Sequence, residues 1–307
     1  MAEASSDHLP AYARLSRKVV YVLVVAALAV PLLFGLSLPP APLPAAKRIY
    51  DKIEKIGASR AELTDETRKV VLVAVDWGPH TRAECYPQTE AVVRHLMLRK
   101  IPFVILTTVV DGAGYAREIP NKLAREYGRE YGTDWVDLGY KPGRSVFVRQ
   151  LAKDFHGAAR TDRDGTPLSE LALTKEIKDA SDVSLLVEIT GLVGFFNMWV
   201  QFFQTERARP DFAHGCTSVT IAEAYTYLES GQIVGLFEGI AGAAAYNELL
   251  EQSRAAGQPH ASDEARLHMT SQSFAHLAVI VLIALGNVGL YVRRKRSADS
   301  QAAGGRP

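Results

Sequence analysis

KVVLVAVDWG, residues 69–78, is an almost uninterrupted run of aliphatic side chains that ends in an acid, an indole and a glycine. It lacks the apolar–polar alternation of a strand that has one face in water. Continuous β-branched runs of this kind are typical of strands in parallel sheets, because helices cover both faces of such a sheet. We therefore expect a buried parallel strand here.

Strand and helix signals alternate over the rest of the central region. Further strands are predicted at 101–110, 133–140, 182–191 and 213–220. Helices are predicted at 87–100, 119–132, 144–155, 195–204, 221–230 and 231–252. Strands that alternate with helices in this way are typical of βαβ units and a mostly parallel sheet.

This pattern predicts the fold class α/β, with a single mostly parallel, doubly wound (Rossmann-like) sheet domain over residues 69–258. Right-handed crossovers between the strands would place helices on both faces of the sheet. A Pro-rich linker and an amphipathic helix precede the domain over 39–68, and a second linker follows it over 259–273. The longest irregular stretch, 156–180, is expected to lie on the surface.

Each end of the chain carries an apolar run long enough to cross a bilayer, which takes about 20 residues. The first run, VVYVLVVAALAVPLLFGLSL, covers 19–38 without a charge, and the second covers 274–292. We predict a transmembrane helix at each. A cleaved signal peptide is the alternative for the first run, although the run is longer than the usual apolar core of a signal. A helical hairpin inside a soluble core is the alternative for both.

Basic residues flank both runs on the side of the chain ends, namely Arg17 and Lys18 before the first run and Arg293, Arg294, Lys295 and Arg296 after the second. Basic residues concentrate on the cytoplasmic side of a membrane. We therefore expect a two-pass protein of the cytoplasmic (inner) membrane, with cytoplasmic tails at 1–18 and 293–307 and an extracytoplasmic α/β domain. The lipid bilayer is thus a predicted partner.

Charge and cysteine content narrow the remaining classes. The formal net charge is +1, so no global field favours a nucleic-acid partner, and none is predicted. The two cysteines, Cys85 and Cys216, are too few for a disulfide framework. They are interpreted as small buried residues, and a disulfide between them would require an oxidising compartment.

Ligands of open parallel sheets bind beyond the carboxyl ends of the strands. This rule gives a candidate ligand or partner site without any motif, which consists of Asp76, Trp77, His80, Asp111, Lys141, Glu188, Thr190 and His214. No catalytic residue is assigned among them.

Asp76 and Glu188 are the sharpest of these candidates. Asp76 either holds a ligand or caps the loop after its strand, as Asp often does in turns. Glu188 lies inside an apolar strand, so it needs a partner or a raised pKa if it is buried. Arg82 and Lys141 are candidate partners for it. His214 is interpreted as an ordinary loop histidine, with a general base as the alternative.

Common catalytic motifs are missing from the sequence. It contains no G-x-x-x-x-G-K-[ST] phosphate loop, no G-x-G-x-x-G after the first strand and no G-x-S-x-G elbow. TDRDGTPLSEL resembles a calcium loop, but Arg160 and Leu171 would occupy its first and twelfth positions, which need acids. Neither a metal nor a cofactor is predicted.

The stretch 231–252 is rich in small residues, and Gly235, Gly239 and Gly242 are predicted to let a helix pack closely against a sheet. A second interpretation of the same glycines is the small-residue motif of membrane helices.

Missing catalytic motifs, two anchors and apolar helices together favour a non-enzymatic envelope assembly component. Its α/β domain would bind a partner protein or a small ligand, and the 231–252 and 194–203 segments would pack in a homo-oligomer or against other envelope proteins. The alternative is a membrane-anchored hydrolase or transferase. In that case Asp76, Asp111 and Glu188 would form an acidic site, with His80 or His214 as the proton carrier.

Overall fold

The computed structural model describes residues 16–61, 69–205 and 208–304. The chain divides into two compact units. One unit comprises Met1–Leu38 together with Leu267–Pro307, and the other comprises Pro39–Arg266. The second unit contains the α/β domain.

The α/β domain is built on a six-stranded sheet in the order β3-β2-β1-β4-β5-β6, in which every pair is parallel. The strands are β1 (Val70–Asp76), β2 (Phe103–Thr107), β3 (Trp135–Tyr140), β4 (Val183–Thr190), β5 (Asp211–Cys216) and β6 (Gly235–Glu238). This is the doubly wound order, with its switch point between β1 and β4. The predicted α/β class with a parallel sheet is therefore confirmed.

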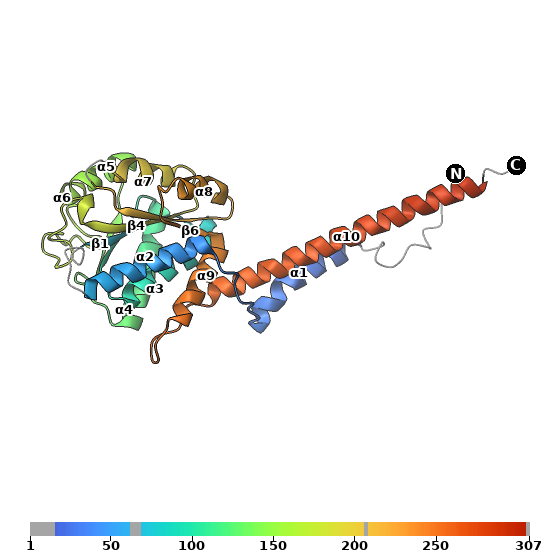
Figure 1. Ribbon diagram of the computed structural model, residues 1–307, viewed down its shortest axis with the longest axis horizontal. Helices are drawn as coiled ribbons and strands as arrows, with labels where there is room; N and C mark the ends of the chain where they lie inside the picture. Colours follow the sequence, from blue (N-terminus) through green and yellow to red (C-terminus); the bar gives the residue numbers. More distant parts are fainter. Residues whose placement is uncertain (1–15, 62–68, 206–207, 305–307) are drawn as a thin grey trace. The chain divides into compact units, whose positions relative to one another are not determined.

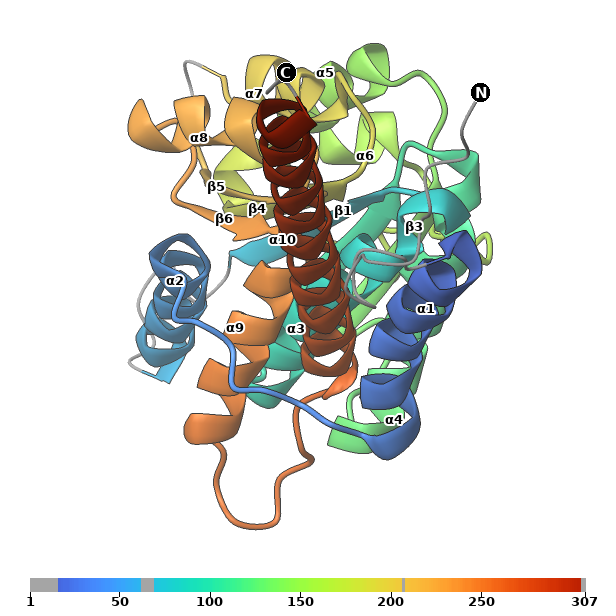
Figure 2. The same ribbon diagram turned by 90° about the vertical axis from the view of Figure 1, so that its right-hand side faces the viewer.

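Helices cover both faces of the sheet, as Figures 1 and 2 show from two directions. One face carries α5 (Ser145–Lys153), α6 (Phe155–Ala158), α7 (Phe195–Phe203) and α8 (Ile221–Glu229). The other carries α2 (Pro44–Ala61), α3 (Arg82–Leu98), α4 (Ala113–Tyr127) and α9 (Gly239–Gln252). Short 3-10 turns η4 (Pro79–Thr81), η5 (Val110–Gly112) and η6 (Ala180–Asp182) complete the described elements.

The apolar run that begins β1 supplies both cores at once. All seven residues of β1 are buried. Val70, Leu72 and Ala74 join the cluster under α5–α8, whereas the residues between them join the cluster under α2, α3, α4 and α9. Alternate side chains point to opposite faces of a strand, so a strand covered on both faces needs apolar residues at every position.

The single helix predicted over 231–252 is wrong, because its first part is the edge strand β6. Gly235 lies in β6, where a Cβ would come within 2.6 Å of Ile49 in α2. Gly239 lies at the start of α9 with a left-handed φ of 59°, and Gly242 follows in that helix. A strand of only four residues that begins with a glycine carries too weak a strand signal to stand out against the helical composition that follows.

The 156–180 stretch is not wholly a surface insertion. Leu168 and Ile177 are buried in the α5–α8 core cluster. Asp162 and Thr174 are buried as well. The Asp162 carboxylate accepts hydrogen bonds from the backbone of Asp164 and Thr166, so DRDG forms a turn.

The unit that holds the chain ends contains α1 (Arg17–Phe34) and most of α10 (Glu264–Gly304). Both helices are long and apolar enough to span a membrane. Only 6% and 11% of their most apolar windows are buried, which argues against a helical hairpin inside a soluble core. α1 ends at Phe34, earlier than the predicted boundary at 38, and α10 begins inside the predicted linker 259–273.

Candidate functional site

The predicted site residues of β1, β4 and β5 meet on the sheet face that α7 covers. Asp76 and Thr190 are register partners of adjacent strands, and Glu188 and His214 are register partners one pleat earlier. All four side chains are buried. Four of the residues selected at the carboxyl ends of the strands therefore form a polar cluster, but this cluster lies beneath a helix.

Asp76 is surrounded by donors from its own fold. Its Oδ2 accepts a 2.7 Å hydrogen bond from Trp199 Nε1. Its Oδ1 accepts hydrogen bonds from Thr108, at 2.6 Å from the backbone N and 2.9 Å from Oγ1. Burial raises the pKa of Asp76, and the bonds from Trp199 and Thr108 oppose this rise. The carboxyl group ties β1 to β2 and to α7.

Glu188 and His214 form a buried pair. His214 Nδ1 lies 2.7 Å from Glu188 Oε2, and the imidazole stacks on the ring of Phe196 with centroids 4.0 Å apart. Burial raises the pKa of Glu188 well above its ordinary value, and burial lowers the pKa of His214 to about 3. Both directions favour the uncharged forms of the two side chains. Glu188 Oε1 has no hydrogen-bond partner among the described residues.

Access to this cluster is narrow. A cavity of about 10 Å³, lined by His214, Thr190, Phe196 and neighbouring residues of the β4–α7 and β5–α8 loops, opens at the sheet edge. About 10–15 Å³ accommodates a single water molecule. A substrate would need α7 to move away.

The other predicted site residues lie elsewhere. Trp77 points to the opposite face, where its ring stacks on Tyr115 and its Nε1 donates to Thr89. His80 and Asp111 are exposed at the carboxyl edge. Lys141 Nζ donates to the Thr161 carbonyl. The three acids proposed for an enzyme therefore do not share one cleft.

Neither predicted partner of Glu188 reaches it. Arg82 lies over the ring of Tyr86 and faces Glu264 at 3.9 Å. The Lys141 ammonium group instead donates to the carbonyl of Thr161. The actual partner, His214, stands directly beside Glu188 in the next strand, a pairing that the sequence could reveal only with the register of β4 and β5 known.

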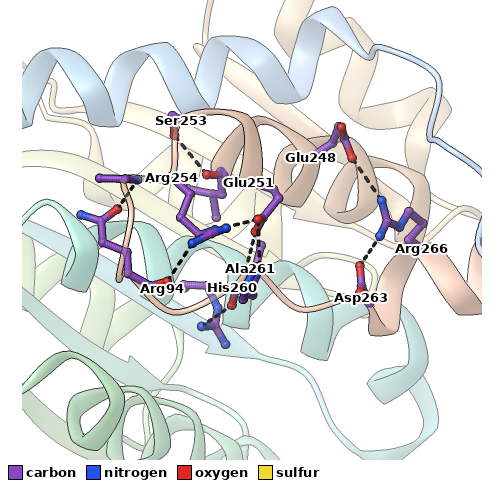
Figure 3. A network of polar contacts seen from close by, with 12 residues as sticks. Arg94, Glu248, Glu251, Ser253, Arg254, His260, Ala261, Asp263 and Arg266 are labelled. Atoms are coloured by element: carbon purple, nitrogen blue, oxygen red, sulfur yellow. Dashed lines mark hydrogen bonds and ion pairs between the residues drawn. The ribbon is translucent and has the colours of Figure 1, made fainter.

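A second polar network fixes the loop after α9, and Figure 3 shows it from close by. Glu251 accepts hydrogen bonds from Arg254 Nε at 2.6 Å, His260 Nδ1 at 2.9 Å and the Ala261 N–H at 3.1 Å. Arg94 of α3 donates to the His260 carbonyl. Each of these contacts is internal, so the network is interpreted as an anchor for the loop.

The residues that sequence reasoning missed are exposed apolar side chains. Among the described residues of the α/β domain, the exposed large apolar side chains are those of Val110, Tyr140, Val146, Val193 and Val219. Tyr140 is the last residue of β3, and the other four lie beyond the carboxyl ends of β2, β3, β4 and β5, respectively. We call these five residues and Arg144 the carboxyl-edge surface. The exposure of a single valine cannot be predicted from sequence. Only the fold shows that these side chains lie at the same edge of the sheet.

Arg144 lies between Tyr140 and Val146 in the chain. Its φ of 44° is a positive value that residues other than glycine rarely adopt. Its guanidinium lies 4.7 Å from the ring centroid of Phe195, so it bridges the β3–α5 and β4–α7 segments. Held backbone strain of this kind clusters at binding and functional sites.

Among the described residues, no group of three or more His, Cys, Asp or Glu side chains is placed to hold a metal ion. Cys85 and Cys216 are both free and buried. Comparison of the chain with protein-family models, with curated proteins and with solved structures finds no match.

Proposed function

We propose that this chain is a membrane-anchored, non-enzymatic binding protein whose α/β domain holds a partner protein at its carboxyl edge. The two apolar helices tether the domain to the membrane. The basic flanks at both chain ends support cytoplasmic termini and an extracytoplasmic domain. The proposal extends to a role in assembly at the cell envelope.

The observation that carries this proposal is where the exposed apolar side chains lie. Val193 and Val219 are 80% and 89% exposed, and Val110 and Val146 are 65% and 71% exposed. Scattered exposed apolar residues are ordinary, but here every one described in the domain lies at the carboxyl end of a strand or in the segment that follows it. Binding residues concentrate on loops held by a rigid scaffold, and these segments leave strands in which all or all but one of the residues are buried.

Arg144 gives the surface the character of a protein-binding site. Arginine and aromatic residues dominate the binding energy of protein interfaces. Tyr140 and the Phe195-stacked Arg144 supply both kinds next to Val146. Because Arg144 is exposed on this surface, a partner that carries an acidic group beside its apolar contact residues fits the surface best.

The buried cluster gives less support to an enzyme. Asp76 already accepts hydrogen bonds from Trp199 and Thr108, and the cavity beside His214 holds about one water molecule. A catalytic acid or base must lie within hydrogen-bond reach of a substrate. Asp111 stands apart from Asp76 and Glu188 at the exposed edge.

Site-specific photo-crosslinking in intact membranes tests the proposal. A photoreactive residue at Val193 or Val219 should give one product of discrete mass, and the same residue at exposed Ser181 should not, because η6 precedes β4 at the opposite edge of the sheet. Arg144→Glu should remove the product while the protein stays in the membrane. Absence of any discrete product at all five apolar positions would reject the proposal.

Two substitutions of exposed residues separate a loss of binding from a loss of folding. Val193→Asp changes an exposed side chain, so it should leave thermal unfolding unchanged within about 0.5 kcal/mol. Ser181→Asp is the matched exposed change at the other edge. Loss of the cross-linked product with Val193→Asp but not with Ser181→Asp assigns the binding to the carboxyl-edge surface.

A further inference from the structure

Two polar side chains, His276 and Asn287, interrupt the apolar run of α10. Both are exposed on the helix. They are eleven residues apart, which is about three turns at 3.6 residues per turn, so they lie on the same face. Asn287 lies more than one turn inside the end of the run at Val292.

This face points away from α1. Ser271 marks the side toward α1, because its Oγ donates a 2.6 Å hydrogen bond to the Leu28 carbonyl. Ala275, one turn later on that side, is also buried. At about 100° per residue, His276 and Asn287 lie about 140° and 160° around the helix from Ser271. Packing against α1 therefore leaves both polar side chains uncovered.

The residues around them follow a heptad pattern. Ser273, Ile280 and Asn287 are spaced by seven, and so are His276, Ile283 and Leu290. Together they form a continuous stripe with the 3–4 spacing of a coiled-coil seam, which we call the polar stripe. A single Asn at such a position sets register and oligomeric state in coiled coils.

We propose that α10 pairs in the membrane with α10 of a second copy of this chain, along the polar stripe. The inference rests on the proposed membrane anchoring. Polar side chains in lipid gain from a partner helix, because lipid tails offer no hydrogen bonds. Every copy inserts with the same orientation, so two copies pair in parallel and each residue of the seam faces its own equivalent.

A second copy fits because asparagine complements itself. The Asn side chain carries both a carbonyl acceptor and an amide donor. At a parallel two-fold seam Asn287 faces Asn287 of the partner subunit, and the amide of one can donate a hydrogen bond to the carbonyl of the other. The polar stripe and the carboxyl-edge surface have no residue in common.

Cysteine cross-linking of the full chain in membranes tests the pairing. Ile280→Cys and Ile283→Cys lie on the polar stripe, and Leu277→Cys and Val281→Cys are controls on another face. The four native side chains are similarly exposed, at 62%, 59%, 60% and 47%. The native cysteines are buried, so the introduced thiols should dominate. Oxidation should yield a disulfide-linked dimer from the two stripe positions only.

Asn287→Leu, added to Ile283→Cys, measures the role of the polar group. It should lower the yield of dimer by about 3- to 20-fold, since one interhelical hydrogen bond contributes that much to association. Equal cross-linking at stripe and control positions, or a linked product of another mass, overturns the inference. Alkaline carbonate extraction separates the two proposals: a chain that stays in the membrane without dimers refutes only the pairing, and a chain that is released refutes the anchoring.

Discussion

The indole Nε1 of Trp199 in α7 donates a 2.7 Å hydrogen bond to Oδ2 of Asp76 at the end of β1. Both residues are fully buried. The bond joins α7 to β1, the strand at the switch point of the sheet. A residue that sequence reasoning offers as a ligand-binding acid is therefore used to hold α7 in place.

Trp199→Phe should lower the free energy of unfolding by about 1–3 kcal/mol beyond the loss of packing, because Asp76 Oδ2 would stay buried without its donor. The change is measured by denaturant titration of the full chain in detergent, with circular dichroism as the signal that reports unfolding. Trp135→Phe is the matched control, since the buried Trp135 Nε1 has no acceptor among the described residues. Equal losses for the two variants would contradict a stabilising role for the Trp199–Asp76 bond.

Glu188→Gln should make stability less dependent on pH above about 4.5, the ordinary pKa of a glutamate. Burial raises the pKa of folded Glu188, so the unfolded chain loses this proton first as pH rises. The wild type therefore loses stability as pH rises from that value toward the folded pKa. Relative to the wild type, the variant should gain stability as pH rises above about 4.5, measured as the urea midpoint at each pH.

His214 contributes on the acid side with the opposite sign. Its folded pKa is lowered to about 3 from 6.5, so the unfolded chain takes up this proton first as pH falls. The stability it contributes is complete above pH 6.5 and is lost toward pH 3. Replacement by Asn should remove that acid-side loss while Glu188→Gln leaves it in place. An identical pH profile for both variants would show that neither side chain titrates as described.

The parallel sheet could be predicted from sequence because its strands are buried on both faces, which favours continuous apolar runs such as 70–75. The candidate acids Asp76 and Glu188 followed from the same logic, since a charge inside such a run stands out. The hydrogen-bond partners of these two acids could not be predicted from sequence. Trp199 and His214 reach them through α7 packing and strand register, which depend on contacts between segments more than 25 residues apart.

Gly235→Ala should destabilise the α/β domain by about 1–3 kcal/mol, the usual cost of overpacking a core. The added Cβ would come within 2.6 Å of Ile49 Cγ1 and 2.8 Å of the Ala45 carbonyl, so α2 would have to move away from β6. Gly114→Ala in α4 is the control, because its Cβ meets nothing within 4 Å. That change should be neutral or stabilising by up to about 1 kcal/mol, given the low helix propensity of glycine.

Protease added to intact spheroplasts should digest the α/β domain and leave both chain ends protected. The reason is the position of Arg17 and Lys18 before the first apolar run and of Arg293–Arg296 after the second, which favours the cytoplasm for both ends. Epitope tags at the two termini report protection, and a tag in the 253–263 loop reports digestion. Neutralising Arg293–Arg296 should weaken the retention of the carboxyl terminus in the cytoplasm, so that a fraction of its tag becomes cleavable. Cleavage of both terminal tags with survival of the loop tag would reverse the proposed orientation.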